Sequence, residues 1–211
     1  MIPMILLIGG ATGVGSSTIA MELGMRLPAR SVIGTDSIRE IIRRVAPKDL
    51  YLPISQSTYN QYEAVRILNE NFLALKEKEK VIAGYKMQTE VVNVGIAAII
   101  ERALVERINL IIEGIHISPE FIDETYISKV LFLLIDIKDP EEHRRRIKRR
   151  EKSYPERVVG KHLSYFPQIR IIRDYMIKTA KKFGIPIIEN KDLESTVEKC
   201  WEEIKKELAS R

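Results

Sequence analysis

Gly-Gly-Ala-Thr-Gly-Val-Gly-Ser-Ser-Thr, residues 9–18, follows directly on the apolar run Met4–Ile8. An apolar strand that leads into a glycine-rich loop and then a helix is typical of a phosphate-binding P-loop, G-x-x-x-x-G-K-[ST]. The glycines let backbone N–H groups approach phosphate oxygens, and the helix N-terminus behind them favours negative charge. We therefore predict a nucleotide phosphate site made of Gly10, Ala11, Thr12, Gly13, Val14, Gly15, Ser16, Ser17 and Thr18.

The loop departs from the P-loop pattern at one position, because Ser16 stands where the lysine is expected. Ser17 still supplies a hydroxyl for Mg²⁺, so we predict ATP and Mg²⁺ as cofactors. The sequence leaves open which cation replaces the lysine. A dinucleotide site is the main alternative, since Asp36 lies 21 positions after Gly15, but the glycine order G-x-x-G-x-G does not fit that fingerprint. A glycine-rich turn without a ligand is the other alternative.

The composition fits one globular domain over residues 1–211, with a net charge of +5 and one cysteine, Cys200. A single cysteine excludes an internal disulfide, and its place in an amphipathic helix indicates a core residue. No apolar run is long enough to span a membrane, so we expect a cytoplasmic protein without membrane contact. The positive charge suits anionic ligands but is too dispersed to predict a nucleic-acid partner. Abundant Ile, Lys, Glu and Arg are typical of thermophilic proteins.

Short apolar runs alternate with helical patterns, which predicts a three-layer α/β/α domain with a five-stranded parallel sheet. The expected strands are Met4–Ile8, Ser31–Ile33, Asn109–Ile112, Val130–Ile135 and Ile185–Ile188. The expected helices are Ser16–Arg26, Ser37–Arg44, roughly Gln56–Lys80 in one or two pieces, Thr89–Arg107, Pro140–Arg150, Gln168–Phe183 and Asp192–Ala209. We expect a helical insertion at about 48–107 to bind the second substrate, and a lid at about 143–166.

Asp36 follows the second strand, at the edge of the sheet where ligands of such folds bind. It would orient an acceptor hydroxyl as a base or hold Mg²⁺ through water, and its structural alternative is a helix N-cap. Arg39 and Arg43 share its helix face, which suits a substrate with a hydroxyl and an anionic group. For both arginines the alternative is a solvated ladder of surface charges.

Glu113 ends an apolar strand in the position of the acid that takes Mg²⁺ through water in P-loop proteins. A base role and a purely structural role at the strand end are the alternatives. His116 follows closely and would contact a substrate phosphate, unless it is a buried histidine with satisfied hydrogen bonds.

An arginine cluster follows the fourth strand, where P-loop kinases carry a lid over the transferring phosphoryl group. Arg146 and Arg150 lie one helical turn apart and are predicted to supply the charge that Ser16 lacks. Nucleic-acid binding and plain surface charge are the alternatives. Near Gly84, Lys86 is a candidate anion hook at a helix N-terminus and Gln88 a candidate reader of a hydroxyl, whereas the alternative is a loop between two helices.

Taken together, the chain resembles archaeal 2-phosphoglycerate kinase from Ile8 to about Ile204. The resemblance rests on residues 8–20, Thr35–Arg39, Ile112–His116, the Glu142–Arg150 stretch and Ile169–Tyr175. It implies a fold of the nucleoside-monophosphate-kinase type and transfer of the ATP γ-phosphoryl to the 3-hydroxyl of 2-phosphoglycerate, giving 2,3-bisphosphoglycerate. Active members carry an N-terminal ATP-cone domain, which we expect to be lacking here because the chain begins at its first strand.

Under this resemblance the partner is a small anionic phosphorylated substrate, and the protein is a monomer or a homodimer. A kinase for another small hydroxy compound, a nucleotide-binding regulator that lost catalysis with its lysine, and a protein acting on nucleic acid are the competing functions. Retention of Ser17, Glu113 and the arginines disfavours the regulator, because a pure binder needs no charges for a transition state.

Overall fold

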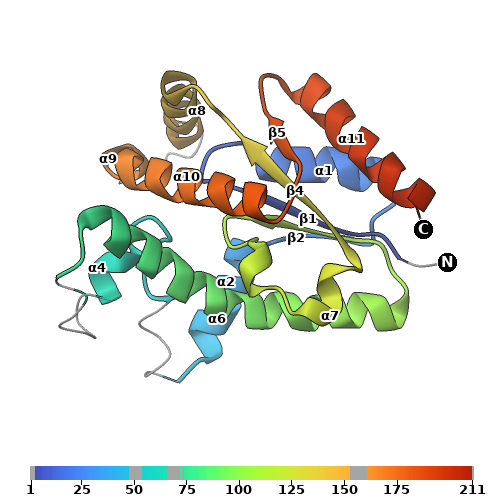
Figure 1. Ribbon diagram of the computed structural model, residues 1–211, viewed down its shortest axis with the longest axis horizontal. Helices are drawn as coiled ribbons and strands as arrows, with labels where there is room; N and C mark the ends of the chain where they lie inside the picture. The colour runs from blue at the N-terminus through green and yellow to red at the C-terminus, as the bar shows by residue number, and fades with distance from the viewer. Residues whose placement is uncertain (1–2, 48–53, 66–71, 73, 153–160, 211) are drawn as a thin grey trace.

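The computed structural model describes residues 3–47, 54–65, 72, 74–152 and 161–210. Its centre is a five-stranded parallel sheet in the order β2-β3-β1-β4-β5 (Figure 1). The strands are β1 Ile5–Gly10, β2 Ser31–Gly34, β3 Leu110–Gly114, β4 Val130–Asp136 and β5 Ile187–Glu189. Each strand begins and ends within two residues of its predicted limits. The predicted fold class is confirmed.

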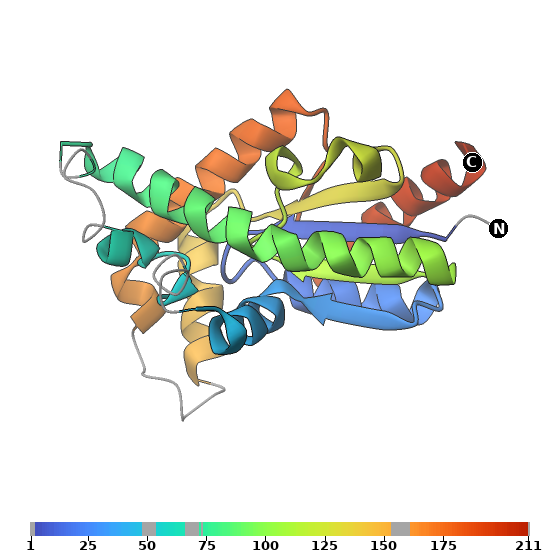
Figure 2. The ribbon, with the colours of Figure 1, turned by 90° about the horizontal axis from the view of Figure 1, so that it is seen from below.

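Successive side chains of the strands point to opposite faces of the sheet, and both sets are buried. Layers of helices therefore cover both faces. Leu6 and Ile8 of β1 belong to one apolar cluster, which includes α1 and α11. Ile5 and Leu7 point into a second cluster with α2 and α6. Figure 2 shows α6 lying along one face of the sheet and reaching past it toward α4.

The helices are α1 Ser16–Arg26, α2 Thr35–Val45, α4 Gln61–Val65, α6 Glu77–Glu106, the 3₁₀ helix η2 Pro119–Phe121, α7 Glu124–Ile127, α8 Pro140–Lys152, α9 Lys161–Ser164, α10 Phe166–Lys182 and α11 Leu193–Ser210. None of the helices in the described part of the chain is long and apolar enough to cross a membrane.

One helix differs clearly from the prediction. The structure has a single helix, α6, where the sequence suggested a helix to Lys80, a break near Gly84 and a second helix from Thr89. A Cβ atom at Gly84 would lie 2.6 Å from the backbone nitrogen of Tyr62. Gly84 therefore allows α4 to pack closely on α6 and does not end a helix.

The first half of α6 and the described part of the predicted lid lie beyond the carboxyl ends of the strands, whereas the second half of α6 packs along the sheet (Figure 1). Of the insertion, residues 48–53, 66–71 and 73 lie outside the described residues, as do residues 153–160 of the lid. The two boundaries stay predictions. The parts that are described, α4, the first half of α6, α8 and α9, surround the edge of the sheet where β1 ends in the glycine loop.

Candidate active site

The glycine loop adopts a conformation that side chains would not tolerate. Gly13 and Gly15 have φ values of 89° and 92°, in the left-handed region that favours glycine. A Cβ atom at Gly13 would lie 2.5 Å from a side-chain carbon of Ile147. Helix α1 begins at Ser16, directly after Gly15. The predicted arrangement of strand, phosphate-binding turn and helix N-terminus is therefore present in the structure.

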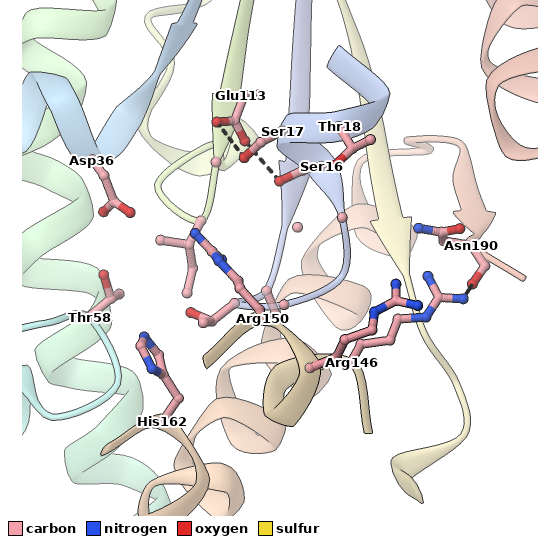
Figure 3. Close-up of a pocket in the computed structure, with 18 of the residues that line it drawn as sticks. Ser16, Ser17, Thr18, Asp36, Thr58, Glu113, Arg146, Arg150, His162 and Asn190 are labelled. Atoms are coloured by element: carbon pink, nitrogen blue, oxygen red, sulfur yellow. Dashed lines mark hydrogen bonds between the residues drawn. The ribbon is translucent and has the colours of Figure 1, made fainter. Parts of the chain in front are cut away.

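The loop opens into a pocket of about 1000 Å³ (Figure 3). It is lined by thirteen of the predicted residues, namely Gly10, Ala11, Thr12, Gly13, Gly15, Ser16, Ser17, Thr18, Asp36, Arg39, Glu113, Arg146 and Arg150. Five predicted residues are not part of this lining, namely Val14, Arg43, Lys86, Gln88 and His116. Val14 is fully buried in the apolar core beneath the loop.

Two serine hydroxyls are directed at the same carboxylate. Ser16 Oγ donates to Glu113 Oε2 at 2.8 Å, and Ser17 Oγ donates to Glu113 Oε1 at 2.9 Å (Figure 3). Burial raises the pKa of Glu113, and the two serine hydrogen bonds oppose this rise. Since the Ser17 proton points to Glu113, the lone pairs of its oxygen remain available to a cation. Ser16 supplies neither a positive charge nor a spare proton to a phosphate.

Hard oxygen donors such as Ser17 and Glu113 are the ligands that Mg²⁺ prefers. In the described residues, no group of three or more His, Cys, Asp or Glu side chains converges as a metal site. In general, Mg²⁺ is held by one or two carboxylates or hydroxyls of the protein together with the phosphates of a substrate.

Arg146 and Arg150 point to different parts of the pocket (Figure 3). Arg146 is held by Glu142, at 2.7 Å, and donates to the backbone carbonyls of Asn190 and Lys191 at 2.9 and 2.8 Å. Arg150 extends toward the Glu113 side of the loop, where its charge acts to lower the pKa of Glu113. Among the described residues, Arg150 forms no ion pair, whereas Arg146 is held by Glu142.

Asp36 lies in the first turn of α2, with a side chain that is 71% exposed and faces the pocket. The N-cap position is taken by Gly34, so the alternative role of Asp36 as an N-cap is wrong. Arg39 Nη1 lies 3.7 Å from Asp36 Oδ1 and also lines the pocket. Arg43 instead pairs with Glu40 and is not part of the lining, so its contact with substrate stays a prediction.

His116 is fully buried in a polar network, which is the structural alternative considered from the sequence. Its Nε2 lies 3.0 Å from Gln88 Oε1, and its Nδ1 lies 2.9 Å from the Thr35 hydroxyl. Gln88 donates its amide protons to Gln56 and Gln61, so its oxygen accepts the His116 Nε2 proton. Burial lowers the pKa of His116 to about 4. A neutral buried imidazole does not bind a substrate phosphate, and that prediction is corrected.

The predicted roles of Lys86 and Gln88 also change, because both lie in the interior of α6 and not at a helix N-terminus. The Lys86 ammonium lies 5.1 Å from the centre of the Tyr175 ring, in a cation–π contact. Gln88 is fully buried and accepts from the Thr58 hydroxyl at 2.6 Å. Gln88 thus supports a pocket residue and does not line the pocket itself.

The pocket also contains residues that the sequence did not single out, among them Thr58, Tyr59, His162 and Asn190. Thr58 and His162 lie on the same side as Asp36, and Asn190 lies on the opposite side near Arg146 (Figure 3). The Tyr59 and His162 rings are 5.3 Å apart, so the loop before α4 contacts α9. Only the position of Thr58 and Tyr59 in the insertion predicted to bind the second substrate hinted at them.

The fold and the loop define the class of the protein: it has the α/β fold of P-loop kinases. A gluconokinase from Sinorhizobium meliloti superposes with a TM-score of 0.52 at 11% identity, covering 97% of this chain and 93% of that one. A shikimate kinase from Acinetobacter baumannii, in complex with shikimate, gives a TM-score of 0.52 at 14% identity, covering 98% and 95%. At these identities the likeness establishes the fold alone.

Sequence comparison is more specific than the fold, and it confirms the resemblance to archaeal 2-phosphoglycerate kinases. The chain is 42% identical to the 2-phosphoglycerate kinase of Methanocaldococcus jannaschii and 41% identical to that of Pyrococcus horikoshii, over 94% and 96% of its length. Identity to the Methanopyrus kandleri enzyme is 36% over 98% of this chain. The chain spans 62–64% of the length of these relatives. No family model matches it.

Proposed function

We propose that this protein is an ATP-dependent kinase that transfers the γ-phosphoryl group to the hydroxyl of 2-phosphoglycerate, giving 2,3-bisphosphoglycerate and ADP. The observation that carries the proposal is the pocket, in which a phosphate-binding loop, the Ser17–Glu113 pair and the arginines of α8 face a separate acidic and basic pair, Asp36 and Arg39. The similarity to archaeal 2-phosphoglycerate kinases supports the choice of acceptor.

On the nucleotide side, the backbone of residues 10–18 and the N-terminus of α1 bind the phosphates of ATP. Ser17 and Glu113 would hold Mg²⁺, which supplies positive charge to the phosphate oxygens when it is bound. Arg146, fixed by Glu142 and by two backbone carbonyls, borders the nucleotide on the side of Asn190.

On the acceptor side, Asp36 orients the attacking hydroxyl and accepts its proton. Arg39 binds the carboxylate or phosphate of the acceptor, since a guanidinium is suited to both. Thr58 donates its own proton to Gln88, and its oxygen lies 3.1 Å from the protonated His116 Nε2. One lone pair of the oxygen is then left to accept a hydrogen bond from the substrate. Of the cations that line the pocket, Arg39 lies beside Asp36 and Arg150 beside the phosphate loop, so we assign these two to the anionic groups of the acceptor.

Arg150 lies between these two sides in Figure 3, next to the phosphate loop. In the proposed reaction it stabilises the negative charge on the equatorial oxygens of the phosphoryl group in flight. This charge comes from α8, so it replaces the lysine of the loop with a residue far away in the sequence.

The test is ADP release from MgATP with 2-phosphoglycerate, compared with 3-phosphoglycerate, glycerate and no acceptor. We expect turnover with 2-phosphoglycerate alone. Turnover with 3-phosphoglycerate or glycerate instead would support the kinase activity but reject 2-phosphoglycerate as the acceptor. Tight binding of MgATP without turnover on any of these acceptors would reject 2-phosphoglycerate as the substrate and favour either another acceptor or a nucleotide-binding regulator.

A further inference from the structure

Two carbonyl groups of the phosphate loop are bound by buried side chains from outside the loop. The Thr12 carbonyl accepts from His143 Nε2 at 2.8 Å, and the Val14 carbonyl accepts from Asn190 Nδ2 at 2.8 Å. His143 belongs to α8 and is fully buried, whereas Asn190 follows β5 and is 5% exposed. Neither contact was indicated by the sequence, since the partners are 131 and 176 residues apart.

The direction of the His143 hydrogen bond follows from its second ring nitrogen. Arg170 of α10 is fixed by the carbonyls of Ile137 and Lys138, at 2.9 and 3.0 Å, and its Nη1 lies 3.4 Å from His143 Nδ1. A guanidinium only donates, so Nδ1 accepts and the proton of the neutral ring is on Nε2. His143 is therefore a fixed donor to the Thr12 carbonyl.

These contacts also determine where two N–H groups point. In a trans peptide the C=O and the following N–H point in opposite directions. The carbonyl of Thr12 shares a peptide with the N–H of Gly13, and that of Val14 shares one with the N–H of Gly15. His143 does not line the pocket, so a Thr12 carbonyl turned toward it directs the Gly13 N–H the other way, toward the phosphate site.

Gly15 is held differently, because Asn190 itself lines the edge of the pocket beside Arg146. A Cβ atom at Gly15 would lie 2.8 Å from Asn190 Nδ2, so the amide packs directly against the loop at that edge. Among the described hydrogen bonds, none uses the N–H of Gly13 or of Gly15. Both donors are left for an anion.

We propose that His143 and Asn190 are positioning residues for phosphate binding, because their hydrogen bonds fix two loop peptides and thereby aim the Gly13 and Gly15 N–H groups at the nucleotide phosphates. In a loop without a lysine, these backbone donors carry a larger share of the binding. The inference rests on the proposed nucleotide site. In it, Arg170 stabilises the tautomer of His143 that has its proton on Nε2.

The test compares four variants by calorimetric binding of MgATP and of inorganic tripolyphosphate, which has no base or sugar. We expect His143→Leu and Asn190→Asp to weaken both ligands at least tenfold. His143→Gln places an amide donor near the position of Nε2 and is expected to bind within about threefold of wild type. Asn93→Asp is the matched control, because Asn93 is buried and also donates to two carbonyls, but away from the loop.

Melting temperatures distinguish loss of folding from loss of binding. Should His143→Leu fail to fold, Asn190→Asp and the amide resonances of Gly13 and Gly15 in the Gln variant still test the proposal. Folded His143→Leu and Asn190→Asp variants with wild-type tripolyphosphate affinity would overturn the inference, as would a Gln variant as weak as the Leu variant. Wild-type protein that binds neither ligand would instead refute the nucleotide site itself.

Discussion

The buried His116 makes the stability of the protein depend on pH in a way that can be calculated. Its pKa falls from 6.5 to about 4 in the folded chain, because protonation would place a charge in a fully buried network. Each pKa unit corresponds to about 1.4 kcal/mol, so this change corresponds to about 3 kcal/mol. Above pH 6.5 the ring is neutral in both states and has no effect. As the pH falls from 6.5 toward 4, only the unfolded state takes up the proton, and the folded state loses this stability.

The assay is urea denaturation of wild type and of His116→Gln at several pH values between 7 and 4, at constant ionic strength. Glutamine keeps an amide donor but does not titrate. Contributions of the other two histidines and of the carboxylates cancel in the comparison. We expect the wild-type free energy of unfolding to fall by about 3 kcal/mol more than that of the variant. Equal pH dependence of the two proteins would show that His116 is not buried as a neutral ring and would refute the reasoning.

Four further predictions concern the pocket. Arg150→Ala should lower kcat roughly 100- to 1000-fold with little change in the KM for ATP. Adding Ser16→Lys to this variant should restore part of the lost kcat. No recovery would contradict the idea that Arg150 supplies the charge of the missing lysine. Arg146→Ala, in contrast, should mainly raise the KM for ATP, and an equal fall in kcat would place it in the transition state. Asp36→Asn should lower kcat about 10²- to 10⁴-fold while ATP binding, measured by calorimetry, stays unchanged. Gly15→Ala should weaken MgATP at least tenfold, because a Cβ there is strained by φ 92° and lies 2.8 Å from a buried amide nitrogen; unchanged affinity would contradict the loop geometry.

Features that depend on local sequence could be predicted well. Helix α1 has the predicted limits, Ser16 and Arg26, because glycines with positive φ fix its start. The acid at the end of β3 could be placed at the phosphate loop, because carboxyl ends of parallel strands meet at one edge. Both arguments need only a few neighbouring residues and the known behaviour of parallel sheets.

Features that depend on packing between distant segments could not be predicted. Gly84 looked like a helix break, yet it permits the close approach of Tyr62 inside one long helix. Lys86 looked like an anion hook, and its actual partner is the ring of Tyr175 in α10. His116 carries the same side chain whether it binds a phosphate or is buried, and only its surroundings decide which.

The continuity of α6 has a consequence for local opening of the protein. Its 30 residues form a rod of about 45 Å that packs on the sheet with one half and carries the wall behind Thr58 with the other. Local opening of proteins often occurs in contiguous cooperative units. We expect amide hydrogen exchange in both halves of α6 to be slow and to share one opening free energy. The surface that we propose to meet the acceptor would then open no more easily than the part of α6 that packs on the sheet.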